Sequence, residues 1–263
     1  MGSLPDLTTF PSLRELGLHH NHLNGTILDN LGKQSRLERL YLGHNSFEGF
    51  ISEAHFSDLT KLKFPFNSYW IFSPQLIYMN MSHNQNQWPY TKFVIGVLLS
   101  PTIDLSSNKL EGEIPSFLFK VTHLDISNNM FSKPAHFLCT TNNRNLSILD
   151  LSNNQFLGEL PNCWMHFEGL KILNLANNHF HGKIPNSIGS LLGIEILDLS
   201  NNSFTGELPS SLKNCTKLKF VNLRDNKLSG QYRCGLGSSH PDLVVLFLRS
   251  NHFFGSIPSH LCL

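Results

Sequence analysis

Residues 198–209 read DLSNNSFTGELP, and near-copies of this stretch occur elsewhere in the chain. DLSSNKLEGEIP occupies 104–115, DLSNNQFLGELP occupies 150–161, and NLANNHFHGKIP occupies 174–185. Repetition at a nearly fixed spacing predicts similar structural units stacked on one another. A chain of 263 residues is long enough for two globular domains or for one elongated array, and the repeat favours the array.

The template LxxLxLxxN fits ten places in the chain. Alternation in its centre predicts a short strand whose leucines share one face, and parallel copies must stack to bury that face. We interpret the recurring Asn as a structural ladder, because a buried amide can both donate to and accept from backbone groups where the chain leaves the sheet. The ladder positions, mostly 24 residues apart, are Asn21, Asn45, Asn84, Asn108, Asn129, Asn154, Asn178, Asn202, Asn226 and Asn251.

The second half of the repeat carries a Gly-x-Ile/Leu-Pro pattern, found at 112–115, 158–161, 182–185, 206–209 and 255–258. Gly permits a sharp turn, and Pro suits an outer edge that needs no N–H group. The whole unit resembles the plant-specific extracellular subclass of leucine-rich repeats, with its LxGxIP signature. Residues 175–230 in particular resemble the plant receptor-like proteins, kinase-less cell-surface receptors that perceive fungal elicitors and apoplastic effectors.

The resemblance implies an α/β solenoid, a right-handed superhelix with parallel strands on the concave face and short 3-10 or irregular segments on the convex side. We expect residues 1–263 to form a single array. The unit at 62–75 is truncated, with Pro65, Asn67 and Trp70 where Leu, Leu and Asn belong, and 84–100 is irregular. The family also implies a cap at each end of the array, and both are missing from this sequence.

Five cysteines are present, and Cys139 and Cys163 stand 24 residues apart in adjacent repeats. Parallel strands lie about 4.8 Å apart, which suits the Cα separation of a disulfide worth roughly 3 kcal/mol. The alternative is two inert core thiols. Cys215 is interpreted as a small buried hydrophobic residue. Cys234 has no obvious partner, and the partner of Cys262 would lie one repeat further on.

Sequons predict N-glycosylation at Asn24, Asn80, Asn145, Asn201 and Asn214, which mildly supports secretion. A glycan on Asn80 or Asn201 would cover part of the strand face. We therefore expect these two sites to be used less often than Asn24 or Asn145.

The composition and motifs give no indication of catalysis. Twenty Lys and Arg residues nearly balance 19 Asp and Glu residues, which leaves no basic stripe for nucleic acid. No nucleophile elbow, phosphate loop or kinase signature occurs, and no Cys or His spacing predicts a metal site. The recurring strand Asp residues could form a carboxylate cluster, but they belong to the repeat and are interpreted as its solvated face. We expect a non-enzymatic protein without a cofactor.

Recognition is the remaining function, because the x positions of LxxLxLxx form a rigid face that lowers the ordering cost of binding. Aromatic and Arg side chains, the usual interface anchors, concentrate in the end repeats; ordinary surface variation is the alternative interpretation. The first two repeats display Arg14, Glu15, His19, His20, Glu38, Arg39, Tyr41 and His44. The last two display Lys219, Phe220, Asn222, Arg224, Asp225, Val244, Phe247 and Arg249.

His20, His44 and His83 occupy the same offset in their repeats, so the rings of His20 and His44 should lie close together. Protonating both rings would then be unfavourable. A partner bound through them would be held with an affinity that changes between about pH 5 and 7.

The resemblance implies a ligand-recognition segment of a plant cell-surface receptor-like protein, in defence signalling or, less often, development. The expected ligand is a protein, peptide or glycan, and a receptor-like kinase would supply the cytoplasmic signal. The segment would lie outside the plasma membrane in the full-length parent, although the chain as written shows no signal peptide or membrane helix. The alternatives are an extracellular inhibitor resembling the polygalacturonase-inhibiting proteins and a truncated, non-functional or decoy product.

Overall fold

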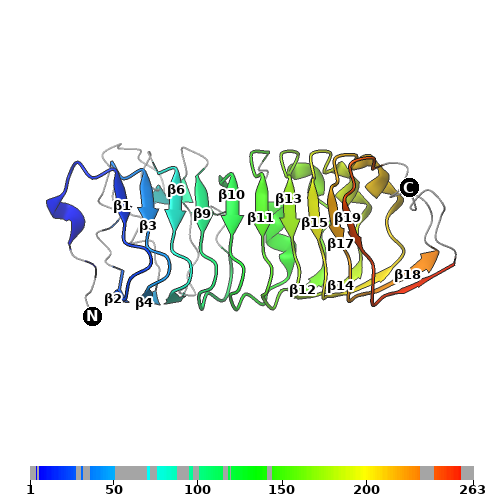
Figure 1. Ribbon diagram of the computed structural model, residues 1–263, viewed down its shortest axis with the longest axis horizontal. Coiled ribbons are helices and arrows are strands. Elements are labelled where there is room, and N and C mark those ends of the chain that lie inside the picture. Colours follow the sequence, from blue (N-terminus) through cyan, green and yellow to red (C-terminus); the bar gives the residue numbers. More distant parts are fainter. Residues whose placement is uncertain are drawn as a thin grey trace. The chain divides into compact units, whose positions relative to one another are not determined.

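The chain folds into two compact units, Met1–Phe131 and Ser132–Leu263. A computed structural model describes residues 4, 6–27, 31, 36–50, 70–71, 76–87, 95–96, 101–114, 118, 120–140, 144–231 and 240–255. Within each unit the backbone winds as a parallel-strand solenoid (Figure 1), which confirms the predicted fold. We call each turn of a solenoid a tier. The single array spanning both units stays a prediction.

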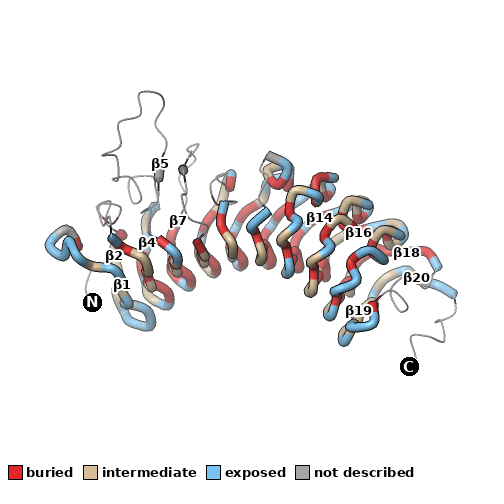
Figure 2. Tube along the Cα trace, turned by 90° about the horizontal axis from the view of Figure 1, so that it is seen from above, coloured by how far each residue is buried: buried red, intermediate tan, exposed pale blue. Residues whose placement is uncertain are grey.

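Each unit has a main sheet, made of one short parallel strand from each tier. In the first unit its strands are β1 (Glu15–Gly17), β3 (Arg39–Tyr41), β6 (Tyr78–Asn80), β9 (Thr102–Asp104) and β10 (His123–Asp125). In the second unit they are β11 (Ile148–Asp150), β13 (Ile172–Asn174), β15 (Ile196–Asp198), β17 (Phe220–Asn222) and β19 (Val245–Phe247). In the inner strands the central side chain is buried, as alternation requires (Figure 2).

The core of each tier is built from the apolar positions of the repeat. Leu149 and Leu151 are 0% exposed, and so is Phe156, two residues after the ladder Asn of the same tier. The ring of Phe156 stacks on that of Phe180 with centroids 6.0 Å apart, and Phe180 stacks on Phe204 at 6.2 Å. Each tier therefore buries its apolar face against the next one, which is what makes such arrays stable.

In each unit a second parallel sheet follows the main strands, and the repeat pattern did not predict it. Its strands in the first unit are β2 (Asn24–Thr26), β4 (Ser46–Phe50) and β7 (Gln85–Gln87). In the second unit they are β12 (Leu157–Glu159), β14 (His179–Lys183), β16 (Ser203–Gly206), β18 (Lys227–Gln231) and β20 (His252–Phe254). The predicted 3-10 segments are also present, as η1 (Leu7–Thr9), η5 (Ala135–Thr140), η6 (Trp164–His166), η7 (Asn186–Ser190) and η8 (Ser210–Asn214).

The ladder Asn side chains join successive tiers. The amide nitrogen of Asn178 donates to the carbonyls of Leu175 (3.2 Å) and Ala176 (3.1 Å) in its own tier and of Leu151 (3.0 Å) in the preceding tier. Its amide oxygen accepts the backbone N–H of Phe156 at 3.0 Å. Asn178 is 6% exposed, so these bonds satisfy backbone groups that water does not reach.

The ladder changes at the N-terminal end of the first unit. Asn21 is exposed, and its amide nitrogen donates to the carbonyls of Leu18 (3.1 Å) and His19 (3.2 Å) in its own tier. Solvent is available to these groups, so the same residue type carries less of the stability here.

The residue before each ladder Asn has a left-handed backbone, with φ between 51° and 56°. Asn, Asp and His tolerate this conformation better than other non-glycine residues. In eight of the ten tiers the backbone N–H of this residue bonds to the next tier, as that of Asn177 does to the carbonyl of Ser200 at 2.9 Å. These left-handed positions are His20, His44, His83, Ser107, Asn128, Asn153, Asn177, Asn201, Asp225 and Ser250.

Glycine in the Gly-x-Ile/Leu-Pro pattern makes room for a side chain of the preceding tier. At Gly182 φ is +77°, and a Cβ would lie 2.7 Å from Cγ of Glu159. Gly230 stands at the equivalent position of a repeat that lacks the Ile/Leu-Pro pair; its φ is +103°, and a Cβ would lie 2.6 Å from Cγ of Glu207. Both backbone conformation and space therefore require glycine.

The structure joins Cys139 in η5 to Cys163, just before η6, by a disulfide with Cα atoms 5.6 Å apart. Cys215 is a free, buried thiol whose Sγ lies 3.6 Å from the carbonyl oxygen of Ile188. Burial raises the pKa of this thiol to about 11. Cys234 and Cys262 lie outside the described residues.

Most of the truncated stretch 62–75 and of the irregular stretch 84–100 also lies outside the described residues. Within them, β5 (Trp70–Ile71) and β8 (Ile95–Gly96) pair in parallel. No helix in the described part of the chain has the length and apolar character needed to cross a bilayer.

Replacing Asn178 with Ala should lower the free energy of unfolding by about 3 kcal/mol, because it leaves buried backbone groups of two tiers unpaired. Asn21→Ala is the matched control and should cost less than about 1 kcal/mol, since water can replace its bonds. Urea unfolding followed by circular dichroism measures both values. Equal losses would show that the ladder bonds do not hold the inner tiers together.

Cys215 should resist alkylation in the folded protein at pH 8, because its raised pKa keeps the thiol protonated and burial blocks access. Iodoacetamide labelling with and without urea, followed by mass spectrometry of the peptide containing Cys215, measures this. Similar labelling rates in both conditions would contradict it.

Candidate functional site

The outward-facing side chains of each main sheet form two rows across the tiers. We call the first residues of the strands the leading row and the last residues the trailing row. In the first unit the leading row is Glu15, Arg39, Tyr78, Thr102 and His123, and the trailing row is Gly17, Tyr41, Asn80, Asp104 and Asp125. In the second unit they are Ile148, Ile172, Ile196, Phe220 and Val245, and Asp150, Asn174, Asp198, Asn222 and Phe247.

The charged candidates of the first two tiers lie together and pair across the tiers. Nη1 of Arg14 is 2.9 Å from Oε1 of Glu38, and Nη1 of Arg39 is 3.5 Å from Oε2 of Glu15. Three of the four side chains are more than 40% exposed, so these ion pairs contribute little to stability. They remain available to a charged partner.

Histidine rings form a column beside these pairs. The rings of His20 and His44 stack with centroids 4.2 Å apart, and those of His44 and His83 stack at 4.1 Å. The ring of His19 lies 5.5 Å from that of His20 and 5.6 Å from that of Tyr41. The structure thus brings together the three histidines that share an offset, and their effect on binding stays a prediction.

Polar members of the trailing row are hydrogen-bonded to one another in pairs, which we call the polar ladder. Nδ2 of Asn80 donates to Oδ2 of Asp104 at 2.6 Å, while Oδ1 of Asp104 accepts the backbone N–H of Ser106 at 3.0 Å. In the second unit Nδ2 of Asn174 donates to Oδ2 of Asp150 at 2.8 Å. The recurring Asp residues therefore hold the strand ends in place.

One residue of the last repeats proves buried. Asn222 is 4% exposed, and its Nδ2 donates to Oδ2 of Asp198 at 2.9 Å. Its expected role as an exposed contact is wrong, because the polar ladder takes up its amide.

Phe220 and Phe247 lie in adjacent tiers, with ring centroids 6.1 Å apart in an edge-to-face arrangement. Nζ of Lys219 lies 2.7 Å from Oε2 of Glu195. This hydrogen bond raises the pKa of Lys219 and lowers the pKa of Glu195. The aromatic pair leaves one ring exposed, since Phe247 is 44% accessible.

Two arginines of the last repeats share one carboxylate. Nε of Arg224 and Nη2 of Arg249 lie 3.5 and 3.9 Å from Oδ2 of Asp225. The side chains of Arg224, Arg249 and Asp225 are 43%, 70% and 36% exposed, all more than a third. Two cations around one anion leave a net positive edge on this end of the second unit.

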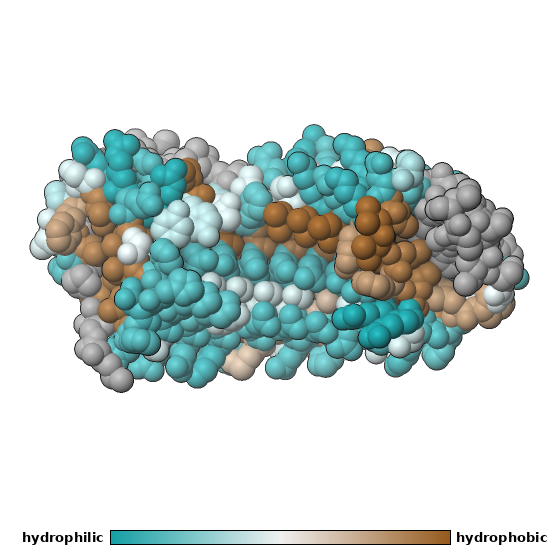
Figure 3. Space-filling model, viewed as in Figure 1, coloured by the Kyte–Doolittle hydropathy of each residue, from teal (hydrophilic) through white to brown (hydrophobic). Residues whose placement is uncertain are grey.

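The leading row of the second unit is apolar, and the sequence pattern did not predict this. Figure 3 shows hydrophobic colour gathered over these strands beside a hydrophilic band. We call Ile148, Ile172, Ile196, Phe220 and Val245 the isoleucine row, and all five are half-buried. The sequence did contain a signal for this row, since an isoleucine directly precedes the central Leu of the strand in three successive repeats.

The sequon residues differ in accessibility. Asn145 and Asn214 are exposed, and Asn24 is half-buried in β2. Asn201 is exposed, although its Nδ2 donates to the neighbouring tier at 2.7 Å. Asn80 is half-buried, with its amide bonded on both sides.

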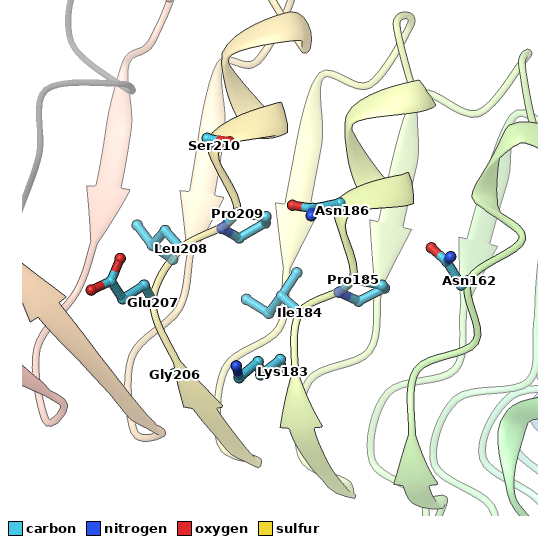
Figure 4. Close-up of a pocket in the computed structure, with 10 residues that line it drawn as sticks. All are labelled: Asn162, Lys183, Ile184, Pro185, Asn186, Gly206, Glu207, Leu208, Pro209 and Ser210. Atoms are coloured by element: carbon cyan, nitrogen blue, oxygen red, sulfur yellow. The ribbon is translucent and has the colours of Figure 1, made fainter.

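A groove of about 730 Å³ lies on another side of the second unit, among the Gly-x-Ile/Leu-Pro stretches (Figure 4). Lys183 and Glu207 are the charged residues in its lining. Pro185 and Pro209 stand at equivalent positions before η7 and η8. The groove is therefore a product of the repeat itself, and it contains no catalytic arrangement. The described residues also contain no group of three or more His, Cys, Asp and Glu side chains placed to hold a metal ion.

Comparison with known proteins connects the repeat to a family. The sequence-family model named Leucine Rich Repeat matches residues 12–34, 102–121, 145–167, 169–191 and 193–215. Receptor-like protein 24 of Arabidopsis thaliana is 32% identical over 193 residues, covering 59% of this chain and 22% of that protein. Receptor-like protein EIX2 of Solanum lycopersicum is 32% identical over 93 residues, covering 35% of this chain and 9% of that protein.

Among solved structures, the Arabidopsis receptor kinase HAESA, in complex with the peptide hormone IDA and the co-receptor SERK1, superposes with a TM-score of 0.70. It is 30% identical to this chain, and the match covers 99% of this chain and 45% of that one. The chain thus spans less than half of HAESA and less than a quarter of the two receptor-like proteins. The described fold and these matches agree: the chain contains leucine-rich repeats, and these repeats are similar to those of plant receptor-like proteins.

Proposed function

We propose that this chain is a ligand-recognition segment of the extracellular part of a plant receptor-like protein. The main observation in support of this function is the pair of outward-facing rows on each main sheet, because strand pairing holds their side chains in register. Because the ladder fixes the backbone beneath them, little ordering is needed when a ligand binds. The matches to receptor-like proteins and to a peptide-bound receptor ectodomain support this function.

The proposed signalling step involves a partner, because the plant receptor-like proteins that these repeats resemble are kinase-less receptors. A receptor-like kinase would bind the ligand-occupied receptor and transmit the signal in plant defence. The co-receptor named in the HAESA complex gives a precedent for such an arrangement in a related fold. Protein, peptide and glycan ligands are all compatible with the mixed polar and aromatic face of the first unit.

The function predicts selective binding through the main-sheet face. Immobilised chain is incubated with fractionated extracellular fluid from elicited leaves, and retained molecules are identified by mass spectrometry. Tyr41→Ser/Tyr78→Ser, which removes a ring pair 4.9 Å apart, or Ile172→Thr/Ile196→Thr should reduce retention of a specific ligand at least about tenfold.

The matched control is Glu48→Ser, an exposed position on the second-sheet strand β4, which should retain the ligand fully. Retention that neither face variant reduces, or that Glu48→Ser abolishes, would overturn binding through the main-sheet face.

Glycosylation should follow accessibility if the chain passes through the secretory pathway. In plant-expressed protein, Asn145 and Asn214 should be occupied. Asn80 should be largely unmodified, because a glycan would break its bonds to Asp104 and Ser82. Site-by-site glycopeptide mass spectrometry measures occupancy. Occupancy of Asn80 equal to that of Asn145 would contradict this prediction.

A further inference from the structure

Three histidine rings stack in the first unit, on the turns that lead from the main sheet to the second sheet. The ring centroids of His20 and His44 lie 4.2 Å apart with an interplanar angle of 11°, and those of His44 and His83 lie 4.1 Å apart at 15°. We call these three side chains the histidine column. It stands outside the leading and trailing rows, whose members belong to the strands themselves.

The backbone beneath each ring of the column is fixed. All three residues have left-handed φ angles, between 51° and 55°. The backbone N–H of His44 donates to the carbonyl of Ser82 at 3.0 Å, and those of His20 and His83 bond to the next tier in the same way, at 3.0 and 2.9 Å. The rings are therefore presented from an ordered scaffold, which lowers the cost of binding a ligand.

The ring nitrogens of the column are open to a ligand. All three side chains are exposed. Stacking covers the faces of the rings and leaves the edges, which carry the nitrogens, accessible. Within the part of the chain that the structure describes, none of these nitrogens forms a hydrogen bond to another residue. Each ring can therefore donate one N–H when neutral and two when protonated.

Little negative charge is available to the column from the residues around it. The carboxylate of Asp104 already accepts hydrogen bonds from Asn80 and Ser106, and at the opposite ends of the strands Glu15 pairs with Arg39. The other ionisable groups on the same turns, strands and following segments are His19, His22, Tyr41, Glu48 and Lys109. Only Glu48 among these carries a carboxylate, so an anion from outside is the main source of balancing charge.

Protonation of neighbouring rings places two positive charges about 4 Å apart. Like charges at this distance repel, so the second proton is disfavoured until an anion offsets it. A tetrahedral oxyanion with two negative charges can accept one N–H from each of two neighbouring rings. Such charge-assisted hydrogen bonds are stronger than neutral ones.

We infer that the histidine column, once protonated, binds a divalent tetrahedral oxyanion across two adjacent rings. The anion is phosphate or sulfate, either free or, for phosphate, as a monoester on a larger ligand. His44 is central to the site, because both adjacent pairs include it. Free histidine side chains take up their proton near about pH 6.5, so binding is present below this pH and lost as the pH rises above it.

The test is an NMR titration of the full chain with sodium sulfate, whose two negative charges persist at both pH values used. Sodium chloride keeps the ionic strength constant. The affinity for sulfate should be at least about tenfold higher at about pH 5.5 than at about pH 7.5, because protonated rings are needed in pairs.

Inorganic phosphate and methyl phosphate, compared at the lower pH, separate the two sources of the anion. At least about tenfold weaker binding of methyl phosphate assigns the site to the free anion, because the ester lacks one of the oxygens that accept charge-assisted bonds. Comparable affinities assign it to the group that a phosphate ester also carries.

His44→Asn should weaken sulfate binding at least about tenfold, because no adjacent pair of rings remains. His20→Asn is the matched control: it also removes one ring but leaves the pair of His44 and His83, and should weaken binding only about twofold. Asparagine occupies the same left-handed position at Asn153 and Asn177, so neither substitution strains the backbone.

His181→Gln, at an exposed histidine of β14 outside the column, should bind sulfate normally. Equal losses in His44→Asn and His20→Asn, an affinity that does not change between the two pH values, or no saturable binding at tens of millimolar sulfate would overturn the inference. The proposed function is tested separately, because Tyr41→Ser/Tyr78→Ser leaves the three histidines in place.

Discussion

The amide side chain of the ladder Asn is the contact on which the rest of the structure depends. A short strand of three residues can form few backbone bonds, and the chain must then leave the sheet with carbonyls and N–H groups still buried. Asn178 bonds to its own tier and to the preceding one, so it closes the turn and joins the tiers in one step. Without the Asn side chain, the turn of every repeat would bury backbone N–H and carbonyl groups that have no hydrogen-bond partner.

The ladder also determines what each main sheet can present. It fixes the backbone on either side of the strand, and the trailing-row carboxylates add bonds to the residues that follow, as Asp198 does to Ser200. The flanking side chains are then displayed from a scaffold that is already ordered. Side chains at single positions such as Tyr41 or Ile172 can therefore change with little effect on the fold, which suits the proposed recognition function.

Much of this architecture could be predicted from the sequence, because it depends on Leu and Asn residues that have the same structural role in every repeat. Leucine spacing gave the strands and their parallel stacking, and the constant offset of Asn gave the ladder position. The second sheet was missed because strands such as His179–Lys183 contain polar residues and a glycine, and they are ordered by the tier next to them. Local pattern carries little information about such pairing.

The proposed binding face was less predictable from the sequence for a related reason. An aromatic or Arg residue is visible in sequence as an unusual choice, whereas Ile at 148, 172 and 196 looks like one more aliphatic residue among many. Only the strand register shows that these three lie outside the core and beside one another. Conversely, Asn222 looked available in sequence and is in fact held by Asp198.

The left-handed position before each ladder Asn has a consequence for how such a protein can diversify. Its backbone conformation excludes most residue types, yet His, Asn, Asp and Ser all occupy it here with φ within a few degrees of one another. Those four differ in charge, size and proton affinity. A point mutation among them can therefore reshape the chemistry of one turn while its neighbours keep their geometry, which gives selection an independently adjustable site in every repeat.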